Sequence, residues 1–420
     1  MDATIEISRQ DRNVLRRLAE RKLEIAVDPT NEERRAAWLA LDSGSNSRIM
    51  VLAEHGGIRD QRKPCTVGSL ECTGEWALGI EKALRAEALL FEEMRDDQVV
   101  EPVMNIGWQV RTSNFGVEAV VHQGGDADHM GSRSWDPPIK DLDGDFDKLR
   151  PRTFCVDRDA TMAQRQRMED VFAGILPVRI RGGHYWSMGL TWKAIDLIGM
   201  EGLMLSMYDN PDGLHRLMAF LRDDELAFSR WLEENELYSL NNENDYIGSG
   251  SMGYTADLPQ DATRQAGSPV REQDLWVLIE SQETVGVGPK LFEEFVFPYQ
   301  LSIAERFGKT YYGCCEPVNN RWSIIKQIPN LARVSVSPWA DQKFMAEALE
   351  RDYVFSRKPN PTLISTGQFD EDAIRADLRK TLEVAHGNRL EIIMKDVHTL
   401  NNEPERLARW VQIAREEIEK

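Results

Sequence analysis

Two short segments carry the residues best suited to chemistry, Cys314-Cys315-Glu316 and Asp396-Val397-His398. Thiolate, imidazole and carboxylate groups bind zinc, and a catalytic zinc needs three protein ligands so that a fourth position stays open. If tertiary structure joins the segments, their side chains can form one site. The alternative is that the cysteines pack inward as small apolar side chains and that His398 only hydrogen-bonds a loop. The predicted metal ligands are Cys314, Cys315, Glu316, Asp396 and His398.

Four further carboxylates follow apolar runs of the chain. They are Glu243, Asp245, Glu280 and Glu283. A carboxylate in such a place can act as a general base, or it can serve as a further ligand of the same metal. The alternative is a structural role, since helix caps and loop salt bridges account for most exposed carboxylates. We expect these four residues to be the catalytic acids and bases.

Aromatic and basic side chains stand near the same segments and are candidates for holding a substrate. The tryptophans, Trp192 among them, offer flat apolar surface that suits an aromatic or planar molecule, although tryptophan often only packs. Two basic residues before Pro359 could hold an anionic group or pair with neighbouring carboxylates. The predicted substrate-binding residues are Asn105, Trp108, Arg181, His184, Trp186, Trp339, Arg357 and Lys358.

Most of these residues follow a short apolar or β-branched run, which indicates the elements that position them. Eight runs are predicted strands: 97–104, 175–181, 237–242, 275–280, 309–313, 332–336, 353–356 and 390–394. Amphipathic helices are predicted between or after them at 161–173, 211–232, 289–307, 371–385 and 403–419. Strands that alternate with helices and are apolar on both faces favour a closed (β/α)8 TIM barrel, in which residues past each strand point into one bowl.

The predicted α/β domain organisation is one TIM-barrel domain over residues 1–420. Residues 1–85 would form an N-terminal helical extension, with helices at 11–26 and 31–41, and residues 86–420 the barrel. Two long stretches interrupt the alternation, one rich in Gly and Asp at 105–149, which includes Gly124 to His129, and one rich in Gly, Pro and Ser at 248–274. Because each follows a strand, we expect these loops to cover the C-terminal face and its site.

Composition excludes several classes of protein. The 420 residues carry a formal charge of -19, from 51 Lys+Arg against 70 Asp+Glu. Such a charge repels phosphate backbones and anionic membrane surfaces, so nucleic acid and membranes are not expected partners. Residues 1–12 are polar where a signal peptide would be apolar, and no run approaches the roughly 20 apolar residues of a membrane span. We expect a cytoplasmic protein.

Five cysteines are present, Cys65, Cys72, Cys155, Cys314 and Cys315. An odd number in a long chain without a secretory signal does not indicate a disulfide framework. The three single cysteines are expected to be small buried side chains or inert surface thiols.

The segment Pro289-Lys-Leu-Phe-Glu-Glu-Phe-Val-Phe-Pro-Tyr299, followed by a helix and then Tyr311-Tyr-Gly-Cys-Cys-Glu-Pro317, resembles the uroporphyrinogen decarboxylase superfamily. The resemblance covers the chain from about residue 85 onward, and is closer to the zinc- and cobalamin-dependent methyltransferases than to the porphyrin decarboxylases. Those methyltransferases have a His-x-Cys metal motif where this chain has Tyr312-Gly313-Cys314, so the histidine is missing. Their second cysteine also has no counterpart, and His398 stands in about its place. The arginine-rich N-terminal signature of true decarboxylases is not evident.

The resemblance implies an enzyme that moves a methyl group from a small methylated substrate, for example by O-demethylation of an aromatic methyl ether. Zinc would be the Lewis acid, and the acceptor would be the corrinoid (cobalamin) of a partner protein, because no cobalamin-binding domain is visible in this chain. A homodimer is compatible with the sequence. Two alternatives stay open: a metal-free decarboxylase of the same superfamily, with Arg181, Arg357 and Lys358 holding carboxylates, and a non-catalytic ligand receptor.

Overall fold

The structure is a computed structural model that describes residues 7–45, 48–64, 68–123, 133–260 and 267–420. Cys65 and the stretch from Gly124 to His129 lie outside the described residues. The chain divides into two compact units. The first unit comprises Met1–Trp108, Asp157–Gly182 and Lys358–Lys420, and the second unit comprises Gln109–Val156 and Gly183–Arg357. Both combine helices with parallel strands, so the α/β class predicted from the sequence is confirmed.

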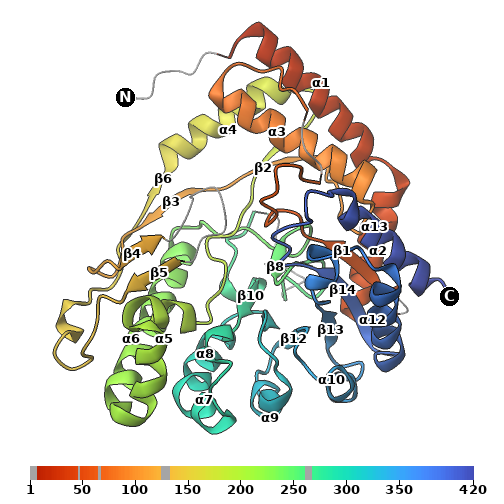
Figure 1. Ribbon diagram of the computed structural model, residues 1–420. Helices are drawn as coiled ribbons and strands as arrows, with labels where there is room; N and C mark the ends of the chain where they lie inside the picture. The colour runs from red at the N-terminus through yellow and green to blue at the C-terminus, as the bar shows by residue number, and fades with distance from the viewer. Residues whose placement is uncertain (1–6, 46–47, 65–67, 124–132, 261–266) are drawn as a thin grey trace. The chain divides into compact units, whose positions relative to one another are not determined.

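Four parallel strands form the centre of the second unit. They are β10 (Trp276–Ile279), β11 (Lys309–Tyr312), β12 (Leu331–Val336) and β13 (Val354–Arg357), paired in that order. Helices connect the strands, as Figure 1 shows: α7 (Pro289–Phe295) and α8 (Phe297–Ala304), then η5 (Asn319–Arg321) and α9 (Trp322–Ile325), then α10 (Gln342–Leu349). All four residues of β10 and of β13 are buried, and β10 accordingly appears in the sequence as a continuous apolar run.

Two long helices pack together in the second unit, α5 (Thr191–Asp209) and α6 (Pro211–Glu234). Helix α6 begins after Asn210, whose side chain accepts a hydrogen bond from Gly213 N, and Pro211 occupies its first turn. Its buried face includes Leu214, Leu217 and Leu221, at helical spacing. The shorter elements are β3 (Gln109–Thr112), β4 (Val120–Gln123), β5 (Arg133–Asp136), η2 (Phe146–Lys148), β6 (Phe154–Asp157), β8 (Tyr246–Gly248), β9 (Ser251–Met252), η3 (Glu272–Asp274) and η4 (Gln282–Thr284).

The first unit contains two parallel strand pairs. β1 (Met50–Ala53) pairs with β14 (Arg389–Met394), and β2 (Met104–Ile106) pairs with β7 (Val178–Ile180). Its helices are α1 (Arg9–Ala26), α2 (Pro29–Ser43), α3 (Glu75–Leu89), the π-helical η1 (Leu90–Met94), α4 (Arg158–Phe172), α11 (Thr362–Ser365), α12 (Glu371–Val384) and α13 (Glu405–Ile418). Helix α1 packs against α3 and α4 through an apolar core that contains Leu15, Leu84 and Phe172.

Six of the eight predicted strands are confirmed, at 175–181, 275–280, 309–313, 332–336, 353–356 and 390–394. The predicted strand 97–104 is a strand only from Met104 on, because Asp97 instead uses its backbone and side chain to bond Val51 and because Pro102 cannot donate to a ladder. The predicted strand 237–242 was wrong. There the Asn241 side-chain amide, and not its backbone, exchanges two hydrogen bonds with Trp276.

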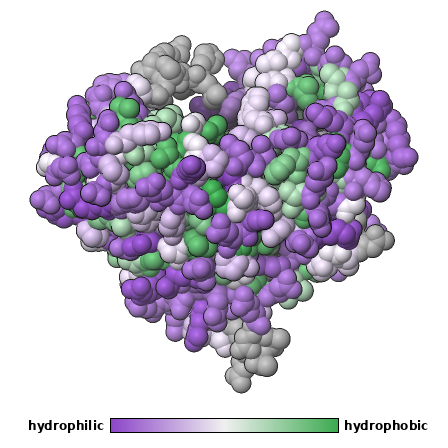
Figure 2. All heavy atoms as spheres, turned by 90° about the horizontal axis from the view of Figure 1, so that it is seen from below, coloured by the Kyte–Doolittle hydropathy of each residue, from purple (hydrophilic) through white to green (hydrophobic). Residues whose placement is uncertain are grey.

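The predicted helix 289–307 is two helices, since α7 ends at Phe295 and α8 begins at Phe297. Pro298 has no N–H to donate to the preceding turn, which breaks the ladder of hydrogen bonds there. Among the described residues, no helix has both the length and the apolar character that crossing a membrane would need. The face shown in Figure 2 is mostly hydrophilic, as expected for a chain in which 29% of residues are charged.

Candidate functional site

Glutamates and cysteines gather in the second unit where β10 and β11 end. Glu280 directly follows β10, Glu283 lies in η4, and Cys314 to Glu316 follow β11. Because the two strands are parallel neighbours, their carboxyl ends lie at the same edge of the sheet. Glu316 joins these ends, accepting hydrogen bonds from the N–H of Ser281 (2.8 Å) and of Cys314 (2.9 Å). We call Glu280, Glu283, Cys314, Cys315 and Glu316 the acidic thiol cluster.

A chain segment beside β10 brings a hydroxyl to Glu280. Met188 N–H donates to the carbonyl of Leu278, and Ser187 Oγ donates to Glu280 Oε1 over 3.1 Å. The segment approaches so closely that a Cβ atom on Gly189 would lie 2.0 Å from the carbonyl oxygen of Glu280. Glycine is therefore needed at position 189 for Ser187 to reach the carboxyl group.

Burial controls the protonation of Glu280. The side chain is 1% exposed, and its burial, reinforced by the negative charges of Glu283 and Glu316, holds the pKa of Glu280 well above the usual 4.5. Burial also raises the pKa of Glu316, opposed by the backbone N–H groups of Ser281 and Cys314. A buried carboxyl group with a raised pKa keeps its proton near neutral pH. Glu280 can therefore donate a proton as well as accept hydrogen bonds.

Glu283 is buried, and only one of its two carboxylate oxygens has a hydrogen-bond partner among the described residues. Its side chain is 5% exposed, and Thr191 Oγ1 donates to Oε2 over 2.6 Å. The other oxygen, Oε1, is buried and has no hydrogen-bond partner among the described residues. An unsatisfied buried acceptor is costly, so Oε1 is a candidate contact for a ligand.

The two adjacent cysteines suit zinc in their chemistry and in their spacing. Neither forms a disulfide. Cys314 is buried and Cys315 is partly exposed, and their Sγ atoms lie 3.6 Å apart. A tetrahedral zinc with Zn–S bonds of about 2.3 Å holds two sulfur ligands roughly 3.8 Å apart. Within the described parts of the chain, no three or more His, Cys, Asp or Glu side chains are already arranged as a metal site. The thiols thus fit two positions of a zinc, and a third donor would have to join them.

The cluster opens on a cavity of about 490 Å³ in the second unit. Three tryptophans line it: Trp135 from β5, Trp192 from α5, and Trp339 after β12. Cys315 and Glu283 line the same cavity, together with Ile195, Met200, Gln282, Val285 and Pro317. We call this space the tryptophan cavity. It places a thiol and a buried carboxylate against broad aromatic surfaces.

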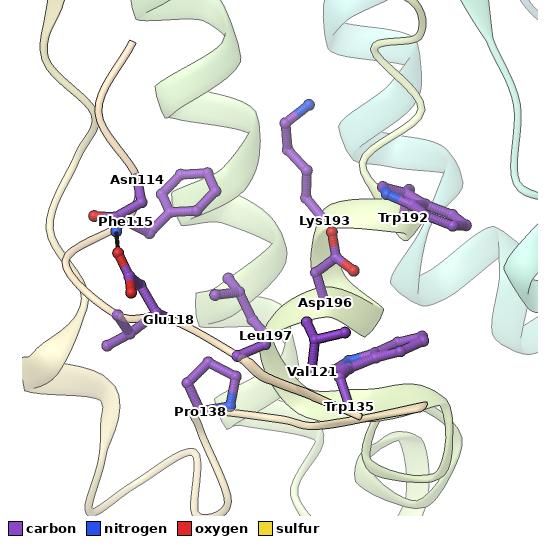
Figure 3. Close-up of a pocket in the computed structure, with 12 residues that line it drawn as sticks. Asn114, Phe115, Glu118, Val121, Trp135, Pro138, Trp192, Lys193, Asp196 and Leu197 are labelled. Carbon is purple, nitrogen blue, oxygen red and sulfur yellow. Dashed lines mark hydrogen bonds between the residues drawn. The ribbon is translucent and has the colours of Figure 1, made fainter. Parts of the chain in front are cut away.

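Two further cavities share tryptophans with this one. A cavity of about 330 Å³ is lined by Glu280, Ser187, His184, Trp186 and Trp192, among others. A cavity of about 700 Å³, drawn in Figure 3, is lined by Trp135 and Trp192 together with Lys193 and Asp196. Figure 3 shows both tryptophans on one side of that cavity and the hydrogen bond from Asn114 to Glu118 (3.0 Å) on the other. Trp192 therefore lines all three spaces.

The other predicted residues of the second unit have separate surroundings. His184 Nε2 lies 3.1 Å from the carbonyl oxygen of Leu237, and burial lowers the pKa of His184, which favours the neutral ring. Arg357 is buried as the last residue of β13. Glu243 and Asp245 lie in the loop before β8, where Glu243 N–H donates to the Asp245 carboxylate over 3.1 Å, and neither lines any of the three cavities.

The remaining predicted residues belong to the first unit. Asn105 accepts a hydrogen bond from Arg179 Nε (3.0 Å), and Trp108 stacks under the guanidinium of Arg158. Arg181 N–H donates to the carbonyl of Ile106. Lys358 is buried, whereas Asp396 and His398 are exposed after β14.

Sequence reasoning missed two polar residues that follow β1. Burial raises the pKa of Glu54, partly offset by the charge of Lys395, and burial lowers the pKa of His55. Glu54 N–H donates to the carbonyl of Met394, so these residues lie beside the end of β14. The signal was available, because Met50–Ala53 is an apolar run followed by Glu-His-Gly-Gly. Trp135 was also missed.

Comparison with known proteins identifies a likeness of fold. No protein-family model matches the chain, and no match among curated proteins was found. The fold is similar to the solved structure of a methyltransferase from Methanosarcina mazei, with a TM-score of 0.50 at 12% sequence identity. The likeness covers 92% of this chain and 99% of that protein.

Proposed function

We propose that the chain is a methyltransferase component that moves a methyl group from a small methylated substrate to the corrinoid cofactor of a partner protein. The observation that carries this proposal is the pair of thiols at zinc-like spacing, near a buried glutamate with a raised pKa and an aromatic cavity. The likeness in fold to a methyltransferase supports it. We also propose that the chain closes into a single (β/α)8 barrel, which the parallel order from β10 to β13 with intervening helices favours.

In this proposal Cys314 and Cys315 are two ligands of a zinc ion. When bound, zinc would supply a Lewis acid that polarises the atom from which the methyl group departs. Glu316 has a positioning role, because both of its oxygens accept backbone N–H groups that fix the strand ends and the cysteine turn. Glu243 and Asp245, whose contacts shape a loop, are not assigned a chemical role.

Glu280 is the proposed general acid. Its raised pKa keeps a proton available, while Ser187 Oγ and the backbone N–H of Gln282 orient the carboxyl group from 3.1 Å each. A methyl ether would leave behind an alkoxide or phenolate, which is a poor leaving group unless it is protonated or polarised. The tryptophans would hold the rest of the substrate and exclude water from the transfer.

A metal-free decarboxylase is less well supported by this site. Its substrate would bring carboxylates that need cationic partners. The residues described around the tryptophan cavity include no Lys, Arg or His, although Arg152, His184 and Lys193 line the neighbouring cavity that contains Glu280. The acidic thiol cluster would repel such a substrate. Methyl transfer is therefore the preferred function.

The proposal is tested by methyl transfer to free reduced cobalamin from a panel of small methyl ethers and methylated amines, followed by the cobalamin absorbance change. Cys315→Ser should lower the rate by at least about tenfold together with zinc content. Cys155→Ser, which changes an exposed free thiol elsewhere, is the matched control and should retain both. Release of CO₂ from carboxylated substrates, with no methyl transfer, would refute the proposal.

A further inference from the structure

We infer that the tryptophan cavity binds a small methylated ammonium cation, so that the methyl group to be transferred is carried on positively charged nitrogen. The substrate role of this cation rests on the proposed function, whereas its binding can be measured without any transfer. The inference comes from the aromatic walls, the buried carboxylate and the absence of positive charge among the described lining residues.

The aromatic walls are available to a ligand. Trp192 is 51% exposed and Trp339 is 66% exposed, so neither side chain is buried in the core. Trp135 lines the same cavity from the β4–β5 hairpin. Several indole faces around one space attract a cation through their negative quadrupoles, and tryptophan is the strongest of the aromatic residues in this respect.

The Glu283 carboxylate supplies the opposite charge in the lining of the cavity. Glu283 lines it, is 95% buried, and has Oε1 without a hydrogen-bond partner among the described residues. Its other oxygen is fixed by Thr191, whose side chain is fully buried at the start of α5. The carboxylate is therefore held in place, and a cation in the cavity would compensate its burial.

The surroundings favour a cation over a neutral or anionic ligand. Glu316 lies close enough to Glu283 for their charges to interact, and the whole chain carries a charge of -19. Ile195 and Met200 add apolar surface that suits methyl groups but cannot satisfy an ammonium with several N–H donors. A nitrogen that carries mostly methyl groups matches this combination of charge and apolar contact.

The inferred substrate class changes what the site must do. When a methyl group leaves a quaternary nitrogen, the carbon–nitrogen bond breaks and its electron pair stays on nitrogen. The methyl carbon accepts a new electron pair from the reduced corrinoid of the partner, and the amine departs neutral. A quaternary nitrogen has no lone pair to offer zinc, and the departing amine needs no proton. Transfer from an ammonium substrate should therefore depend less on zinc and on Glu280 than transfer from an ether does.

The test is a calorimetric titration of the full chain with choline and with 3,3-dimethyl-1-butanol, its neutral isostere. Choline should bind at least about tenfold more tightly, because only the positive charge distinguishes the two molecules. Glu283→Gln and Trp339→Ala should each weaken choline binding by about tenfold and leave binding of the isostere unchanged. Tyr208→Ala removes an exposed aromatic ring from the same helix as Trp192 and is the matched control.

Equal affinity for the two molecules, or unchanged choline binding by a folded Glu283→Gln variant, would overturn the inference. Circular dichroism of each variant shows whether it has folded, and the conservative Glu283→Asp variant should restore part of the affinity. Methyl transfer from ethers without choline binding would overturn the inference and keep the proposed function. Choline binding without methyl transfer from any substrate would keep the inference and refute the proposed function.

Discussion

Replacing Glu280 with glutamine should make the protein less sensitive to rising pH. In the folded chain the pKa of Glu280 lies well above the usual 4.5, chiefly because the side chain is buried. An unfolded chain would release this proton at about the usual pKa, whereas the folded chain keeps it. The contribution of Glu280 to stability is therefore fully present below the unfolded pKa and is lost as the pH rises towards the folded pKa.

The magnitude follows from linkage. Between its unfolded and folded pKa values, one such group costs about 1.4 kcal/mol of folding free energy for each pH unit. From pH 5 to pH 7 the wild-type chain should lose up to about 2.7 kcal/mol through Glu280, and Glu280→Gln, which cannot ionise, should not. Because Glu280, Glu283 and Glu316 interact, the measured value belongs to the cluster and would be shared among its members.

The assay is thermal unfolding of both proteins at pH 5 and at pH 7, followed by circular dichroism. The melting temperature of Glu280→Gln should rise relative to wild type by a few degrees at pH 7 and by much less at pH 5. Glu243→Gln, a partly exposed carboxylate, serves as the matched control and should follow the wild type at both values. A Glu280→Gln variant whose pH dependence parallels the wild type would show that Glu280 is ionised in the folded chain.

Three further changes test the local structure. Gly189→Ala should lower the melting temperature strongly, because the added Cβ would overlap the Glu280 carbonyl oxygen. Gly288→Ala is the control and should not, because a Cβ at position 288 would have no atom within 4 Å. Equal melting temperatures of the two variants would contradict the close approach at Gly189. Glu316→Gln should lower the free energy of unfolding by about 1–3 kcal/mol, because it leaves one of two backbone N–H groups without its acceptor. An unchanged unfolding transition would contradict that role of Glu316. Alkylation of the four described cysteines, followed by mass spectrometry, should modify Cys155 first and Cys315 next. Cys314 and Cys72 should react last, because both are buried and burial raises the pKa of Cys72 to about 12. Early modification of Cys72 would contradict its burial.

The strands that sequence patterns predicted well share one physical property. Nearly every residue of β10, β12, β13 and β14 is buried. β10 is an unbroken apolar run, whereas in the other three strands apolar residues are interspersed with Arg333 and Ser335, with Ser356 and Arg357, and with Glu391. β1 is also a buried apolar run, of four residues, but it follows helix α2 in a part of the sequence where helical periodicity is the stronger signal, and it was missed. The segment 237–242 has the sequence pattern of a strand. In the structure the side chain of Asn241, and not its backbone, bonds the backbone of Trp276, and hydrophobic periodicity cannot indicate such a contact.

The site was predictable as a set of positions but not as an arrangement. Glu280, Glu283 and Cys314 to Glu316 could be named because each stands just past an apolar run. That Glu316 bonds two backbone N–H groups, and that Glu283 has an unpaired oxygen, depends on contacts between segments distant in sequence. Trp135 lies in the stretch 105–149 that was expected to cover the site, but it was not named as a substrate-binding residue, because nothing in a Gly- and Asp-rich stretch without periodicity distinguishes one side chain.

The central claim is that the adjacent cysteines are zinc ligands of a methyltransferase site. X-ray absorption at the zinc K edge on the zinc-loaded full chain tests it most directly. The proposal predicts a first coordination shell with two sulfur atoms at about 2.3 Å, reduced to one in Cys315→Ser and unchanged in Cys155→Ser. A shell of nitrogen and oxygen atoms alone, or one unaffected by Cys315→Ser, would contradict it.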